Sequence, residues 1–206
     1  MYEKGCFIVR EGMIGPCGPS SFINALELKG SLKLARELSE IGRMKPSKAS
    51  DFTSFLIWSE KYKIKDIKIF VENLKVPDGF FKLFFRYEHI PKKDQKRMKI
   101  ELIKNHSNLV KRYRKKIRYL RGDPVNKINF LLNKGYTVIY FMADYFGGPY
   151  LISHVRVIWK REKERYFVKD SYFGNLVLSK NEVIKGIKNL ERIGSRKVIV
   201  GLKKNN

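Results

Sequence analysis

The spacing of the apolar residues changes at Gly135, and this change limits the possible folds more than any other feature of the chain. Before Gly135 the apolar residues mostly recur three and four positions apart, which is typical of helices that bury one face. After it they form short runs of Val, Ile, Tyr, Phe and Leu, which are typical of strands. Helices followed by strands predict an α+β domain, with an N-terminal helical part packed on a C-terminal antiparallel sheet.

The expected elements follow from these patterns and from the turn residues between them. Helices are predicted over 20–43, with a break at Gly30-Ser31, and over 50–63, 92–121, 124–134 and 180–190. Strands are predicted over 66–71, 137–142, 151–160, 165–170, 176–178 and 197–202. Pro77-Asp78-Gly79 is a turn signal. Because the chain contains no internal repeat or obvious linker, we expect one domain over 1–206, with the helix at 92–121 as a basic insertion.

Positive charge is the strongest bias of the composition. The chain has 44 Lys and Arg against 20 Asp and Glu, and the segment from Lys92 to Arg121 has 13 basic and two acidic residues. Such an excess indicates contact with a polyanion such as nucleic acid, with Tyr113 or Tyr119 available to stack on bases. A solvated helix face in a protein from a heat-adapted organism is the other interpretation, and the presence of a single glutamine, Gln95, agrees with it.

The N-terminal residues lack the basic start, the apolar stretch and the small-residue cleavage site of a signal peptide. The longest apolar runs elsewhere are interrupted by Asp144 or by glycines, so no membrane contact is expected. The chain has two cysteines, Cys6 and Cys17, which are too few for a disulfide framework. These features predict a cytoplasmic protein with two free thiols.

Cys17 is the first candidate for chemistry. It lies in Gly15-Pro-Cys-Gly-Pro-Ser20, between turn-forming residues at the start of an apolar helix. The positive end of the helix dipole and the free N–H groups of the first turn favour a thiolate at this position. The same N–H groups, above all that of Cys17, can stabilise the oxyanion of a tetrahedral intermediate. A buried structural cysteine is the alternative, and this is the role that we expect for Cys6, which stands beside Phe7.

His154 and Asp170 supply the partners that a nucleophilic thiol needs. His154 lies early in one predicted strand and Asp170 ends the next, so two adjacent antiparallel strands can hold an imidazole against a carboxylate. With Asp170 accepting from one ring nitrogen, the other nitrogen faces the thiol as a base. Cys17 precedes His154 by 137 residues, within the range of about 130–150 expected for papain-type enzymes. Asp144 is a rival orienting residue.

These motifs resemble the papain-like superfamily and, within it, the C39-like peptidases. The matching residues are Cys17-Gly18-Pro19-Ser20 at the nucleophile helix, His154-Val-Arg-Val-Ile158 at the base, and Asp170-Ser171 before Gly174. The resemblance spans the chain end to end, although its specific motifs cover a small share of it. It implies a papain-like fold and a Cys17-His154-Asp170 triad that cleaves a peptide or amide bond without a cofactor. Phytochelatin-synthase-like transferases are similar in the Cys17 segment as well.

Glu11 departs from the family pattern. Papain-like enzymes usually have a glutamine six positions before the nucleophile, whose side-chain amide helps to hold the oxyanion, and this chain has Glu11 there. An ionised carboxylate would repel both the oxyanion and the thiolate. Three outcomes stay open at this stage. Glu11 is protonated and donates, or it turns away and leaves the backbone alone at the oxyanion, or the site no longer hydrolyses its substrate.

Three functions are therefore compatible with the sequence. A cysteine hydrolase would cleave a peptide or amide substrate, and an acyl or peptidyl transferase would pass the acyl group to an amine or thiol with the same three residues. A disabled papain-like module would instead hold nucleic acid or an acidic protein through the basic segment 92–121. No metal site is expected, because His89 and His106 have no ligand spacing to each other or to Cys6.

Overall fold

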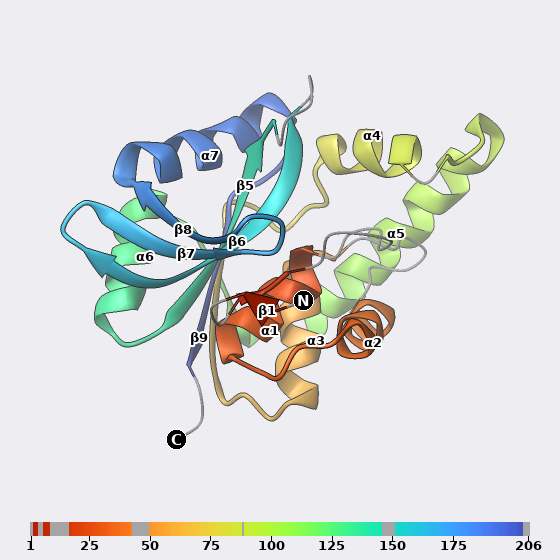
Figure 1. Ribbon diagram of the computed structural model, residues 1–206. Helices are drawn as coiled ribbons and strands as arrows, with labels where there is room; N and C mark the ends of the chain where they lie inside the picture. The colour runs from red at the N-terminus through yellow and green to blue at the C-terminus, as the bar shows by residue number, and fades with distance from the viewer. Residues whose placement is uncertain are drawn as a thin grey trace.

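A seven-stranded sheet forms the centre of the computed structural model, with strands in the order β4-β3-β9-β5-β6-β7-β8 (Figure 1). Its strands are β3 (Asp66–Val71), β4 (Ile117–Tyr119), β5 (Thr137–Asp144), β6 (Ile152–Glu162), β7 (Arg165–Asp170), β8 (Gly174–Ser179) and β9 (Val198–Lys203). A separate pair is formed by β1 (Tyr2–Glu3) and β2 (Cys6–Phe7). The helices are α1 (Cys17–Leu26), α2 (Leu32–Gly42), α3 (Phe52–Lys61), α4 (Asp78–Tyr87), α5 (Lys92–Arg112), the 3-10 turn η1 (Arg114–Lys116), α6 (Pro124–Asn133) and α7 (Lys180–Arg192). The structure describes residues 2–3, 6–8, 17–42, 50–87, 89–145 and 151–203.

Both faces of the sheet are covered by helices. One core joins α1, α2 and α3 to the side chains of Ile139, Phe141 and Ala143 on β5. A second core joins α6 and α7 to the alternate side chains of β5, which are Val138, Tyr140 and Met142. A strand buried on both faces shows no alternation of polar and apolar residues, which explains the continuous apolar run of β5. Figure 1 shows α6 and α7 on one side of the sheet and α1 and α3 on the other.

The fold class is α+β, as predicted, but the sheet differs from the expected one in two ways. β3 comes from the first half of the chain and β4 also precedes Gly135, and both extend the sheet because β3 pairs along its whole length with β9. β3 and β4 are parallel, with Ile69 opposite Ile117, so the sheet is not wholly antiparallel. The sheet therefore draws its strands from both halves of the chain.

The predicted helix over 92–121 is wrong at its C-terminal end. α5 ends at Arg112, η1 follows, and Ile117 begins β4. Tyr113 is the C-cap of α5 and is buried, and its hydroxyl donates a hydrogen bond to Glu60. Ile117 is buried against Ile69 at the edge of the sheet. A long-range strand pairing therefore outweighs the local helical spacing in this segment.

The predicted turn at Pro77-Asp78-Gly79 is also wrong, because α4 begins at Asp78. A proline just before a helix and an acidic residue in its first turn both favour a helix N-terminus, so the same three residues that signal a turn also suit a helix start. The N–H of Gly79 donates to the carbonyl of Gly194 at 3.1 Å. A Cβ at Gly79 would lie 1.9 Å from the carbonyl oxygen of Ile193, so only glycine allows this close approach.

Candidate active site

Cys17 is the first residue of α1 and is half-buried. The glycine that follows it is there for packing, since a Cβ at Gly18 would lie 2.8 Å from Cβ of Ser50 and 3.3 Å from the ring of Trp58. Ser50 and Trp58 therefore lie directly against the first turn of α1. The N–H groups of such a first turn have no partners within the helix. Cys17 thus stands where the helix offers hydrogen-bond donors to an anion.

Buried hydrogen bonds hold α1 at a fixed place on the sheet. Ser21 donates through Oγ to the carbonyl of Val155 at 3.1 Å, one residue beyond His154 on β6. Asn24 accepts from the N–H of Phe7 at 2.6 Å and donates to its carbonyl at 3.1 Å, which joins β2 to α1. The hydrogen bond between Ser21 on α1 and Val155 on β6 therefore helps to fix the distance between Cys17 and His154.

The structure brings Cys17, His154 and Asp170 together. Nε2 of His154 lies 3.1 Å from Oδ2 of Asp170, and because a carboxylate only accepts, Nε2–H is the donor. Nδ1 is the ring nitrogen that remains for the thiol. Burial by itself would lower the pKa of His154, but hydrogen bonds to Asp170 and to the Cys17 thiol, together with their negative charge, raise it to about 8. The imidazole is therefore largely protonated at neutral pH and lies against the thiol.

Asp170 is fully buried at the end of β7, and four donors hold its carboxylate. Oδ2 accepts from Nε of Arg156 at 2.6 Å and from His154. Oδ1 accepts from the N–H groups of Tyr172 at 2.7 Å and Phe173 at 3.1 Å. Burial would raise the pKa of Asp170, but its bonds to His154 and Arg156 and their positive charge hold that pKa well below the usual range. Asp170 is thus a fixed anion that orients the imidazole.

Two residues of the site were not predicted from the sequence. Arg156 stands two positions after His154 on β6, so the period of a strand places both side chains on one face. This spacing could have predicted Arg156 at the site. The ring of Tyr172 lies 5.2 Å from the His154 ring, between their centroids. Burial and the negative charges of Cys17 and Asp170 raise the pKa of Tyr172 to about 12, so its hydroxyl stays protonated. No sequence pattern marks Tyr172, because its position depends on the turn after β7.

The other sequence candidates are Asp144, Glu11 and Cys6. The side chain of Asp144 is 45% exposed and lies 4.0 Å from Arg156, so Asp170 and not Asp144 orients His154. Glu11, predicted at the oxyanion position, lies outside the residues that the structure describes. Cys6 is buried, its thiol donates to the carbonyl of Asp170 at 3.5 Å, and burial raises its pKa to about 11. Cys6 is therefore a core thiol behind the site.

The two other histidines take no part in the site. His89 is exposed and has a positive φ of 50°. His106 is buried, where Nε2 donates to the carbonyl of Leu74 at 2.9 Å and Nδ1 lies 3.2 Å from Oδ2 of Asp51. His106 therefore belongs to a second buried polar cluster, which includes Asp51 and Arg196.

Large apolar side chains are exposed at the end of the sheet that holds the triad. Tyr145 directly follows β5, and Ile152 is the first residue of β6. The two are close because Asp144, the last residue of β5, pairs with Ile152. Tyr172 and Phe173 are exposed in the turn between β7 and β8, directly after Asp170. An apolar surface beside the half-buried Cys17 is suited to hold an apolar side chain of a ligand.

Within the residues that the structure describes, no three His, Cys, Asp or Glu side chains are grouped to hold a metal ion. No helix in that part of the chain is long and apolar enough to cross a membrane. Neither a protein-family model, nor a curated protein, nor a solved structure matches the chain. The functional argument therefore rests on the geometry around Cys17.

Proposed function

We propose that the protein is a cysteine hydrolase that cleaves a peptide or amide bond with Cys17 as nucleophile, His154 as acid and base, and Asp170 as the orienting residue. The observation that carries this proposal is the hydrogen-bonded chain from the thiol through the imidazole to a fully buried carboxylate. A histidine that only packs in a core needs neither a thiol at its second nitrogen nor a carboxylate fixed by four donors. A papain-like fold of the C39-like type is part of the proposal.

The chemistry follows from the positions of the proton and the charge. The Cys17 sulfur attacks the substrate carbonyl carbon, and the oxyanion accepts a hydrogen bond from the N–H of Cys17 at the start of α1. Protonated His154 gives its proton to the leaving amine as the carbon–nitrogen bond breaks, which leaves a thioester on Cys17. Water then attacks the thioester, His154 takes a proton of that water, and the acid leaves as the Cys17 thiolate and the protonated imidazole are restored.

The exposed apolar residues beside the triad indicate the substrate class. Tyr145, Ile152, Tyr172 and Phe173 offer contact area to a large apolar side chain next to the scissile bond. We therefore expect peptides with an aromatic or branched aliphatic residue at this position to be cleaved faster than peptides with an acidic one. Fluorogenic peptides that differ only at that residue measure this preference.

Alkylation with iodoacetamide at neutral pH tests the reactive thiol. We expect Cys17 to be modified at least about 100-fold faster than Cys6, because Cys6 is buried with a raised pKa. His154→Gln, which keeps the size and a donor toward Asp170, is expected to slow the labelling of Cys17 by about tenfold or more. Mass spectrometry of the two cysteine-containing peptides gives both rates. Equal labelling of Cys17 in the wild type and in His154→Gln would refute the proposal.

The raised pKa of His154 predicts the pH dependence of turnover. Transfer of a proton to the leaving amine needs the imidazolium, and its population falls about tenfold per pH unit above a pKa of about 8. We expect kcat/KM to decrease above about pH 8.

The proton on His154 also stabilises the folded state, because the pKa of His154 is about 8 in the folded state and near 6.5 in the unfolded state. Below the unfolded pKa this proton contributes about 2 kcal/mol to the free energy of unfolding, and the contribution is lost as the pH rises through about 8. Denaturant unfolding at several pH values measures this loss, which His154→Gln should abolish.

A further inference from the structure

A basic surface continues from the end of α5 through η1 and β4 to α6. Between residues 111 and 134 the chain has nine Lys and Arg and one acidic residue, Asp123. Asp123 is occupied as the N-cap of α6, where its side chain accepts from the N–H of Val125 at 2.9 Å. The cations of this stretch therefore have almost no local counter-charge.

The cations differ in how far they are already neutralised. Arg112 is paired with Glu60 through two hydrogen bonds, so its charge is satisfied within the protein. Lys115, Arg118 and Arg121 are exposed and form no ion pair with any residue that the structure describes. These three cations are therefore available to a polyanion at η1, β4 and the residue that follows Leu120.

Two exposed aromatic rings stand among these cations. Tyr119 on β4 is 47% exposed, and the guanidinium of Arg114 lies 5.4 Å from its ring centroid. Phe130 on α6 is 48% exposed, and the ammonium of Lys127 lies 5.3 Å from its ring centroid. Tyr113, which the sequence offered as a second stacking residue, is buried and cannot stack on a base. Only the tertiary structure brings Phe130 to this surface.

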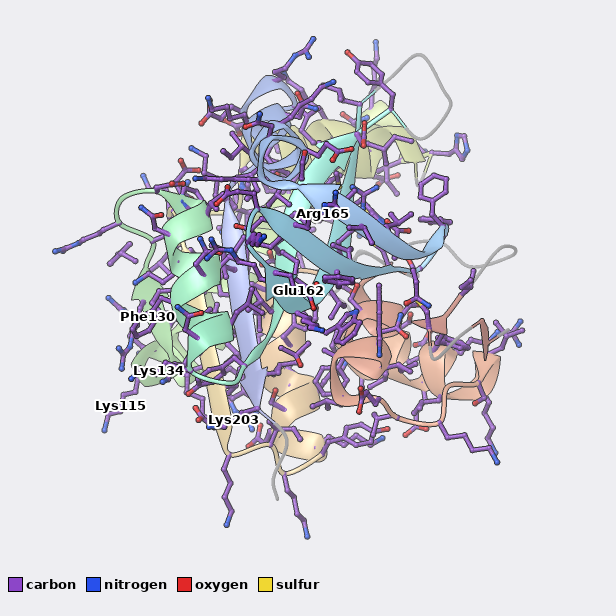
Figure 2. The ribbon with its side chains drawn as sticks, turned by 60° about the vertical axis from the view of Figure 1, so that its left-hand side comes forward. Lys115, Phe130, Lys134, Glu162, Arg165 and Lys203 are labelled. Carbon is purple, nitrogen blue, oxygen red and sulfur yellow. The ribbon has the colours of Figure 1, made fainter. Side chains whose placement is uncertain are left out.

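The two rings lie near the same edge of the sheet, Tyr119 on the face of Ile117 and Phe130 on the opposite face, which holds Phe70. Arg118 and Tyr119 pair with Phe70 and Val71 of β3. The ammonium of Lys127 lies 4.7 Å from the ring centroid of Phe70, so α6 packs against the strand next to β4. Figure 2 shows Phe130, Lys134 and Lys115 pointing outward on the same side of the molecule. We call the surface formed by Arg114, Lys115, Arg118, Tyr119, Arg121, Lys127, Phe130 and Lys134 the basic aromatic surface.

We propose that the basic aromatic surface binds single-stranded nucleic acid, with phosphates on its cations and unpaired bases on Tyr119 and Phe130. Cations alone attract any polyanion, whereas exposed rings among cations match a strand whose bases are accessible for stacking. A duplex keeps its bases stacked internally, and an anionic membrane offers no aromatic bases. The chemistry of the surface thus favours an unpaired strand over either of these.

A neighbouring groove extends the positive path beyond Arg114. This groove has a volume of about 650 Å³, and Lys75, Lys99, Lys111 and Arg114 contribute cations to its lining. Its single acidic lining residue, Asp78, lies 3.4 Å from the ammonium of Lys99. Because Arg114 contacts both the groove and Tyr119, a strand bound at Tyr119 can continue along the groove.

The basic aromatic surface is separate from the candidate active site. α6 and α1 belong to cores on opposite faces of the sheet, as Figure 1 shows, and three strands separate β4, which holds Tyr119, from β6, which holds His154. Binding and thiol reactivity can therefore be measured independently. Cys17→Ser should abolish turnover and leave nucleic-acid binding unchanged, so failure of one proposal does not imply failure of the other.

Fluorescence anisotropy with labelled single strands of about 20 nucleotides, one of thymidine and one of uridine, tests the proposal on the full chain. We expect binding of at least one strand at low salt, with competition by unlabelled single strand far more effective than by duplex or by phosphatidylserine vesicles. Tyr119→Ala and Phe130→Ala should each weaken binding by about 5-fold to 100-fold. Lys115→Glu with Arg118→Glu should also make the slope of log K against log salt shallower by about 0.7 for each lost phosphate contact.

Matched controls distinguish this surface from the general charge of the protein. Lys29→Glu with Lys33→Glu makes the same charge change on exposed residues at and before α2, and Ile100→Ala removes an exposed apolar side chain from α5. Both controls should bind within about twofold of the wild type. Tyr119→Phe should keep the binding, because the ring is retained.

Three results would overturn the proposal. The first is the absence of wild-type binding to either nucleic-acid strand at low salt. The role of the cations would then be to prevent the exposed edge strand β4 from pairing with a β-strand of another molecule. The second is an equal loss of binding in the Lys29 and Lys33 control. The third is wild-type affinity in both aromatic variants, which would reduce the surface to a general polyanion contact. Circular dichroism of each variant establishes that it is folded.

Discussion

Asp170→Ala is expected to lower the free energy of unfolding by about 3–5 kcal/mol, because it removes the carboxylate from a buried ion pair. Arg156 would keep its positive charge in a buried position after losing its 2.6 Å contact with Oδ2. The N–H groups of Tyr172 and Phe173 would lose their acceptor as well. Chemical denaturation followed by circular dichroism measures the change.

The same substitution should reduce turnover by at least about 100-fold, since His154 would lose the bond that fixes its ring. Asp170→Asn keeps the shape and an acceptor oxygen, so it separates the loss of charge from the loss of packing if the alanine variant unfolds. Asp144→Ala is the matched control, because Asp144 is 45% exposed and lies 4.0 Å from the same Arg156. We expect it to change stability by less than about 0.5 kcal/mol. Similar stability of the two alanine variants would contradict the assigned role of Asp170.

Asp51→Ala is expected to have an effect of similar size, in the second buried polar cluster. Asp51 is buried before α3, and its Oδ2 accepts from Nη2 of Arg196 at 2.6 Å and lies 3.2 Å from Nδ1 of His106. Arg196 also donates to the carbonyl of Lys75 at 2.5 Å. Removing the carboxylate leaves Arg196 buried with an uncompensated charge, which typically costs about 3–5 kcal/mol.

The readouts for Asp51→Ala distinguish structure from chemistry. Denaturation should show the loss of stability, while the rate of Cys17 alkylation under native conditions should fall far less than in His154→Gln, because Asp51 bonds to His106 and Arg196 and not to His154. Asp78→Ala removes a carboxylate that is 87% exposed and lies 3.4 Å from Lys99, so it is expected to change stability by less than about 0.5 kcal/mol. If Asp51→Ala is as stable as Asp78→Ala, the buried cluster does not hold α3 and the segment before β9 together.

The prediction of elements succeeded where the local pattern and the tertiary contacts agree. β3 and β7 have the predicted limits, 66–71 and 165–170, because both begin after turn residues and alternate with the period of a strand. α5 was predicted too long because Tyr113 and Leu120 continue the helical spacing of the segment, yet β3 provides a strand partner against which Ile117 is buried. The pairing of strands that are distant in the sequence decides whether such a partner is present, and the spacing of apolar residues gives no information on that pairing.

The sequence by itself determined the candidate nucleophile, base and orienting residue, since Cys17 stands at a helix start and His154 and Asp170 stand near the ends of neighbouring strands. The tertiary structure decided what surrounds them. Arg156 and Tyr172 reach the site through strand register and the turn after β7. It likewise buried Tyr113 and placed Phe130 near the basic edge of the sheet. The physical reason is that periodicity depends on neighbours along the chain, whereas burial, charge pairing and ring contacts depend on residues far apart in it.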